Sequence, residues 1–80
     1  MKDIEMITTF IPDKLPIPYR FRIAAEDQSL LVVKINHILF AEEDKKEQKI
    51  KYRCTCTING IKRTYDIYYM KESMKWYIRA

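Results

Sequence analysis

Basic and tyrosine side chains on one face of the C-terminal half are the residues of this sequence best suited to chemistry. If residues 49–79 run as antiparallel strands, eight such side chains point to the same side: Lys49, Lys51, Arg53, Lys62, Tyr68, Lys75, Tyr77 and Arg79. Basic groups neutralise phosphates, and exposed aromatic rings offer faces on which unstacked bases can lie. We therefore expect this face to bind DNA or RNA. The alternatives are a plain solvated sheet surface, for which Lys, Thr and Tyr are also suited, and a protein partner.

Other groups with reactive potential lack the partners that chemistry would need. Cys54 and Cys56 point to the same side of an extended segment, where a disulfide would be strained, so we expect buried free thiols. A zinc site needs four ligands, and His37 is the only other soft candidate. The acidic run Glu42–Asp44 lacks the spacing and glycine of a calcium loop. With no glycine-rich phosphate loop and no nucleophile–base pair in view, we expect no enzyme, no metal and no cofactor.

Length and charge limit what the chain can be. Its 80 residues allow a single domain, residues 1–80, with a net charge of +4. Residues 1–44 hold 5 basic and 8 acidic side chains, whereas residues 45–80 hold 10 and 3, which favours a polyanionic partner. No apolar run is long enough to span a membrane, and the first residues lack the pattern of a signal peptide. We expect a cytoplasmic protein with no membrane contact.

The clearest element is a β-hairpin around Asn59-Gly60, a dipeptide that favours a two-residue type I′ turn. Residues 50–58 alternate between apolar and polar, and the turn fixes a register in which paired residue numbers sum to 119. Arg53 then opposes Asp66, and Lys51 opposes Tyr68. A second hairpin through residues 71–74 adds residues 75–79 as a third strand. The inner face of this three-stranded meander holds apolar side chains from Ile50 through Ile61 to Ile78, with Arg63 as a polar exception.

The N-terminal half is less regular. We expect residues 1–13 to be a loose arm or an edge strand, through which strand addition would give a homodimer. Residues 19–23 alternate, placing Tyr19, Phe21 and Ile23 inward and Arg20 and Arg22 outward, where they extend the basic face if their strand borders it. Residues 30–40 favour a strand bent near residues 36–37, with a helix as the alternative, and residues 42–48 favour a charged loop or one helical turn. The fold class is all-β: a small open barrel or rolled antiparallel sheet, loosely SH3-like.

Several short motifs resemble a family of very small proteins carried on integrative and conjugative elements of Gram-positive bacteria. The resemblance covers roughly residues 14–79, and it rests on residues 15–22 (Leu-Pro-Ile-Pro-Tyr-Arg-Phe-Arg), Arg53-Cys54, Asn59-Gly60, Tyr65, Ile67, Tyr69 and Lys75-Trp76-Tyr77. It assigns no catalytic residues. It implies a cytoplasmic accessory of mobile DNA, which is either a non-catalytic nucleic-acid-binding protein or a protein-interaction module that acts as an inhibitor. The acidic run at residues 42–44 departs from the shared pattern.

Overall fold

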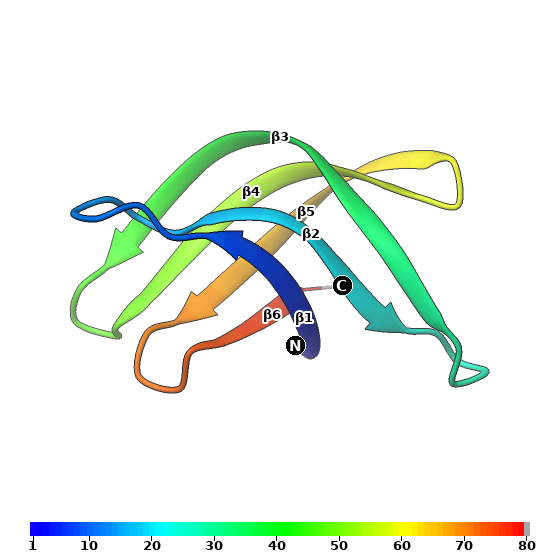
Figure 1. Ribbon diagram of the computed structural model, residues 1–80, viewed down its shortest axis with the longest axis horizontal. Helices are drawn as coiled ribbons and strands as arrows, with labels where there is room; N and C mark the ends of the chain where they lie inside the picture. The colour runs from blue at the N-terminus through cyan, green and yellow to red at the C-terminus, as the bar shows by residue number, and fades with distance from the viewer. Residues whose placement is uncertain (80) are drawn as a thin grey trace.

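Six antiparallel strands follow one another in the computed structural model of this chain, which describes residues 1–79 (Figure 1). They are β1 (Lys2–Thr9), β2 (Ile17–Ala24), β3 (Leu30–Asp44), β4 (Lys49–Ile58), β5 (Ile61–Met70) and β6 (Lys75–Arg79). Each strand pairs with the next, and β6 returns to pair with β1, which closes a barrel. The all-β prediction is therefore confirmed, and the helical alternative for residues 30–40 is wrong. Within residues 1–79 there is no helix that could cross a membrane.

The β4–β5 hairpin has the predicted register over ten residue pairs, from Ile58 opposite Ile61 to Lys49 opposite Met70. Asn59 and Gly60 have φ values of +50° and +77°, as a type I′ turn requires. The β5–β6 register is also as predicted. One inward assignment is wrong, because Ile61 is 55% exposed. The hairpin turn extends beyond the body of the barrel, as the yellow loop in Figure 1 shows, so no opposite strand covers this side chain.

Strand β3 is the longest element, and it contains the predicted bend as two β-bulges. Its register against β4 shifts between Ile35 and His37 and again between Ile38 and Phe40. The extra residues increase the local twist and let one long strand curve around the barrel. The prediction of a loop or helical turn for residues 42–48 is wrong for its first part. Residues 42–44 continue β3, where Glu42 and Asp44 lie opposite Lys51 and Lys49 and form favourable cross-strand neighbours.

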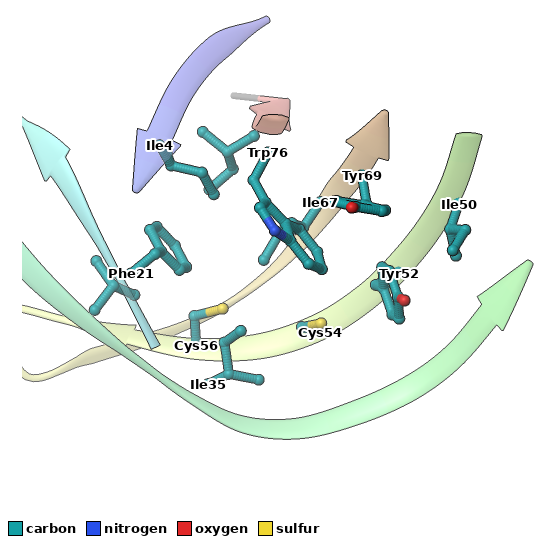
Figure 2. Packing of buried hydrophobic residues seen from close by; sticks show 12 residues of the cluster. Ile4, Phe21, Ile35, Ile50, Tyr52, Cys54, Cys56, Ile67, Tyr69 and Trp76 are labelled. Atoms are coloured by element: carbon teal, nitrogen blue, oxygen red, sulfur yellow. The ribbon is translucent and has the colours of Figure 1, made fainter. Parts of the chain in front are cut away.

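Apolar and aromatic side chains from all six strands fill the barrel (Figure 2). Trp76 lies near the centre, with its ring centroid 4.8 Å from that of Tyr69 and 5.5 Å from that of Tyr52. Phe21 and Ile4 contribute the β2 and β1 side of the same cluster. Burying an aromatic side chain of this size removes roughly 150–250 Å² from water, so a few rings supply much of the stabilisation of so small a core.

Strand β2 contains a bulge that reverses the orientation of Tyr19. Its register against β1 shifts where Ile7 pairs with Arg20 and Thr8 pairs with Pro18, which leaves Tyr19 as the extra residue. Tyr19 is consequently 54% exposed and Pro18 is buried in its place. The inward assignment of Tyr19 is therefore wrong, whereas Phe21 is buried as predicted.

The β1–β2 hairpin joins the other four strands at only one end. β1 pairs with β6 through residues 2–4, and β2 pairs with β3 through residues 20–24. Residues 2–9 thus form a paired strand rather than a loose arm. Toward residues 10–16 the hairpin diverges from its neighbours, and side-chain contacts hold its turn. The Tyr52 hydroxyl donates a hydrogen bond to the Pro16 carbonyl, Leu15 packs against the core, and the Phe10 and Tyr69 rings lie 6.3 Å apart.

Candidate nucleic-acid interface

The outer face of β4, β5 and β6 carries all eight side chains predicted to bind nucleic acid, and one of them, Lys62, lies near the tip of the β4–β5 hairpin. Two cross-strand rows organise this face. Lys51, Tyr68 and Tyr77 are register neighbours in the first row, and Arg53, Asp66 and Arg79 are neighbours in the second. The predicted side-by-side placement of the two tyrosines is therefore confirmed.

Acidic side chains neutralise much of the charge on this face. The Arg53 guanidinium donates to both Asp66 carboxylate oxygens, at 2.8 and 3.2 Å, and the Lys51 ammonium lies 4.0 Å from the same carboxylate. The hydrogen bonds from Arg53 lower the pKa of Asp66 below its ordinary value, so the carboxylate is charged at neutral pH. From β3, Glu42 and Asp44 lie opposite Lys51 and Lys49. A phosphate approaching these cations would have to compete with carboxylates already in place.

Tyr68 does not provide the exposed ring that stacking requires. Its side chain is only 8% exposed, although it points away from the core cluster. The Lys49 ammonium lies 5.9 Å from the ring centroid, and Lys51 and Tyr77 flank the ring in register. Long lysine stems cover apolar surface while their ammonium groups remain in water, which explains this burial. The expectation of an exposed ring is therefore wrong at Tyr68, and Tyr77 is only partly exposed.

A second set of cations, which includes one that was not predicted from the sequence, lies in one register row across four strands. Arg20 pairs with Lys34, Lys34 pairs with Thr57, and Thr57 pairs with Lys62, all on the outer face. We call these four residues the basic row. With strands about 4.8 Å apart, its ends are about 14 Å apart at the backbone. No carboxylate forms an ion pair with any of its three cations in the part of the chain that the structure describes.

The basic row borders a shallow groove that contains an exposed aromatic ring. The groove has a volume of about 390 Å³ and is lined by Tyr19, Arg20, Val32, Lys34, Asn36 and Thr57. The Arg20 guanidinium lies 5.8 Å from the Tyr19 ring centroid. The Asn36 side-chain amide donates to the Thr57 hydroxyl at 2.8 Å and so closes the far side of the groove. Cations, an aromatic face and amide hydrogen-bonding groups therefore lie within one surface hollow.

Lys34 and Tyr19 could not be assigned to this surface from alternation alone. Arg20 was placed outward correctly, but its strand does not border the β4–β6 face directly, because β3 lies between them. Lys34 completes the link only once the β2–β3 and β3–β4 registers are known. Tyr19 joins the surface through the β2 bulge, for which the sequence carries no clear signal.

The two cysteines are free and buried, as predicted. Burial raises the pKa of Cys54 to about 12 and that of Cys56 to about 11. At neutral pH both groups are therefore neutral thiols, and a thiol is a weak nucleophile compared with a thiolate. No group of three or more potential metal ligands comes together within residues 1–79.

Comparison with known proteins adds no relative. The chain matches no protein-family model, no curated protein and no solved structure. The resemblance to proteins of mobile elements thus stays a prediction, and the functional argument rests on the geometry of the site.

Proposed function

We propose that this protein is a non-catalytic binder of single-stranded nucleic acid and that the basic row and Tyr19 are its main contacts. The observation that carries the proposal is the combination of three cations, which have no carboxylate partner among residues 1–79, and an exposed ring in the adjoining groove. Proteins that bind single strands combine these two elements: cations follow the backbone, and aromatic side chains stack on bases.

In this proposal each part of the surface would have a separate role. Arg20, Lys34 and Lys62 would each contact a phosphate along a path across the strands. One base would stack on the face of Tyr19 that Arg20 leaves open, and the Asn36 amide offers a hydrogen-bonding edge beside it. Lys75 and Arg79, which the sequence also predicted as contacts, are exposed on β6 and would attract the nucleic acid from a distance. Arg53 and Lys51 would contribute less, because Asp66 holds them.

The test is fluorescence anisotropy with labelled single-stranded DNA and RNA over a range of salt concentrations. The triple variant Arg20→Gln, Lys34→Gln, Lys62→Gln removes three positive charges from the basic row. A matched control, Lys14→Gln, Lys45→Gln, Lys46→Gln, removes three exposed charges from loops. If three phosphates are contacted, the slope of log affinity against log salt should fall by about 2 in the first variant only. Equal loss in both variants would mean that only net charge matters and would refute the proposed site.

Tyr19 and Tyr68 provide a second contrast. Stacking of one base on an aromatic ring is worth roughly 1–3 kcal/mol, so Tyr19→Ala should weaken binding by at least about fivefold. Tyr19→Phe keeps the ring and should bind like the wild type. Tyr68→Leu, which removes the ring, should leave affinity unchanged, because the covered Tyr68 ring is not available to a base. A result in which Tyr19→Ala binds normally would exclude stacking at this position.

A protein-interaction module, encoded by a mobile element and acting as an inhibitor, is the second candidate function. The observation that favours it is a set of large apolar side chains on the barrel surface: Ile7, Tyr19, Leu30, Val32 and Leu39 are all more than half exposed. Such side chains in number are typical of surfaces that contact another macromolecule. Absence of nucleic-acid binding at physiological salt would make this the leading function.

A further inference from the structure

We infer that β3 carries a free edge through which two copies of this chain pair, joining their sheets into one. The inference does not depend on nucleic-acid binding. β2 occupies the edge of β3 only as far as Lys34, where it pairs with Arg20. From residue 36 to residue 44, β3 is bonded to β4 on one side, and no strand among residues 1–79 pairs with its other side. This free edge is about 30 Å long at the usual rise per residue.

Apolar side chains cluster on this edge, where a partner strand would cover them. Ile38, Leu39 and Phe40 are consecutive and are 37%, 54% and 38% exposed. A row of unpaired backbone groups beside exposed apolar side chains is a template for strand addition. The Leu39 bulge limits this pairing to a matching strand, because it interrupts a regular ladder.

A second copy of β3 is a suitable partner for this edge, because side chains of the same face then meet and no two acidic side chains oppose each other. The segment 36–44 has Phe40 at its middle, so a two-fold axis near Phe40 uses its full length in an antiparallel pair. If Leu39 remains the extra, unpaired residue that it is against β4, each side chain of one copy lies opposite a side chain of the other copy on the same face of the sheet. Ile38 then opposes Ala41 on the inner face, and His37 opposes Glu42 on the outer face, where a ring N–H can donate to the carboxylate.

Other registers of the same edge are unfavourable. Shifting the axis toward the C-terminal end of β3 would place the carboxylates of Glu42, Glu43 and Asp44 against their copies. Shifting it toward the N-terminal end would run the partner strand into β2, which already bonds residues 30–34. In the register centred on Phe40 no two acids meet, and the contact is the same patch on both copies, as a closed dimer requires.

The test is sedimentation equilibrium of the full chain, where we expect a dimer with a dissociation constant on the order of 10–100 µM, as befits a small interface. His37→Glu places two carboxylates opposite Glu42 and its copy and should weaken the dimer about tenfold. The double variant His37→Glu, Glu42→Lys places opposite charges across the axis and should recover most of the lost affinity. Val32→Glu, on the same strand but outside the free edge, is the matched control and should dimerise like the wild type.

A variant that merely damaged the fold would not be rescued by the second substitution, so recovery separates pairing from stability. A chain that remains monomeric up to about 1 mM would overturn the inference, since that limit corresponds to less than about 4 kcal/mol of association. A dimer that ignores His37→Glu, or that Val32→Glu disrupts equally, would place the interface elsewhere. None of these outcomes bears on the anisotropy results, so the two proposals fail independently.

Discussion

Replacing Tyr52 by Phe tests how the turn of the β1–β2 hairpin is held against the barrel. Tyr52 is 2% exposed, and its ring packs 5.5 Å from that of Trp76. Its hydroxyl donates the hydrogen bond that ties the Pro16 carbonyl to β4. The substitution removes this one oxygen and keeps the ring, so the core remains filled.

The expected loss follows from the hydrogen bond alone. A hydrogen bond in a partly buried site contributes about 1 kcal/mol net, and an acceptor left without a partner adds to the cost of its removal. We expect Tyr52→Phe to lower the free energy of unfolding by about 1–1.5 kcal/mol. For a domain of this size that corresponds to a drop in Tm of roughly 4–12 °C.

Urea denaturation followed by far-UV circular dichroism measures the change without relying on Trp76, whose fluorescence the substitution would alter directly. Tyr77→Phe is the control, because no hydrogen bond of the Tyr77 hydroxyl is found in residues 1–79. Amide hydrogen exchange should accelerate in residues 10–16 of the Tyr52 variant and remain unchanged in the β4–β5 hairpin. If Tyr52→Phe is as stable as Tyr77→Phe, the hydrogen bond does not hold the turn and this account of the hairpin is refuted.

Three further perturbations test the turns, the core and the outer face. Met74 has a φ of +56°, a backbone conformation that glycine adopts more easily than methionine. Met74→Gly should therefore raise the free energy of unfolding, measured in thermal melts, by about 0.5–1 kcal/mol. If Met74→Ala were stabilised by the same amount, backbone strain would be excluded as the cause. Folding raises the pKa values of Cys54 and Cys56 to about 12 and 11. The two neutral thiols therefore stabilise the folded state fully below the unfolded pKa of about 8.5, and this stabilisation is lost as pH rises through the folded-state pKa values. Alkaline urea titrations should therefore show a steeper decline for the wild type than for the double Cys→Ala variant, and parallel curves would contradict the burial argument. Folding lowers the pKa of Asp66, chiefly through hydrogen bonds from Arg53, so its stabilisation is present above the unfolded value of about 4 and disappears as pH falls through the folded value. Asp66→Asn should be less stable than the wild type at pH 7, and the difference should shrink in acid. A difference independent of pH would mean that the pair does not stabilise the fold.

Where local chemistry fixes the backbone, the sequence was sufficient to predict the structure. Asn59-Gly60 determines the type I′ turn, and that turn alone sets all ten residue pairs between β4 and β5. The buried face through Tyr52, Cys54 and Ile67 follows from the same register. Short-range signals of this kind need no knowledge of the rest of the barrel.

Bulges and side-chain packing account for what the sequence could not predict. An inserted residue reverses the faces that follow it, so alternation misplaced Tyr19 before the β2 bulge was known. The burial of Tyr68 depends on the path of the Lys49 side chain from the neighbouring strand. Lys34 joins the basic row only through two registers, neither of which a short turn signal fixes. The candidate site was therefore less predictable than the fold, because it depends on those long-range placements.

Pairing of the first strand with the last also determines the order in which this barrel can fold. Turns of two to four residues join β3, β4, β5 and β6, whereas the contact of Lys2 with Ile78 closes nearly the whole chain into a loop. By loop-closure entropy, that step costs about 2.5 kcal/mol more than closing a four-residue turn. Ring closure should accordingly follow the formation of the meander. Substitutions at Ile4 would then mainly accelerate unfolding if β1 docks after the transition state, and measured folding and unfolding rates of Ile4→Val would show whether it does.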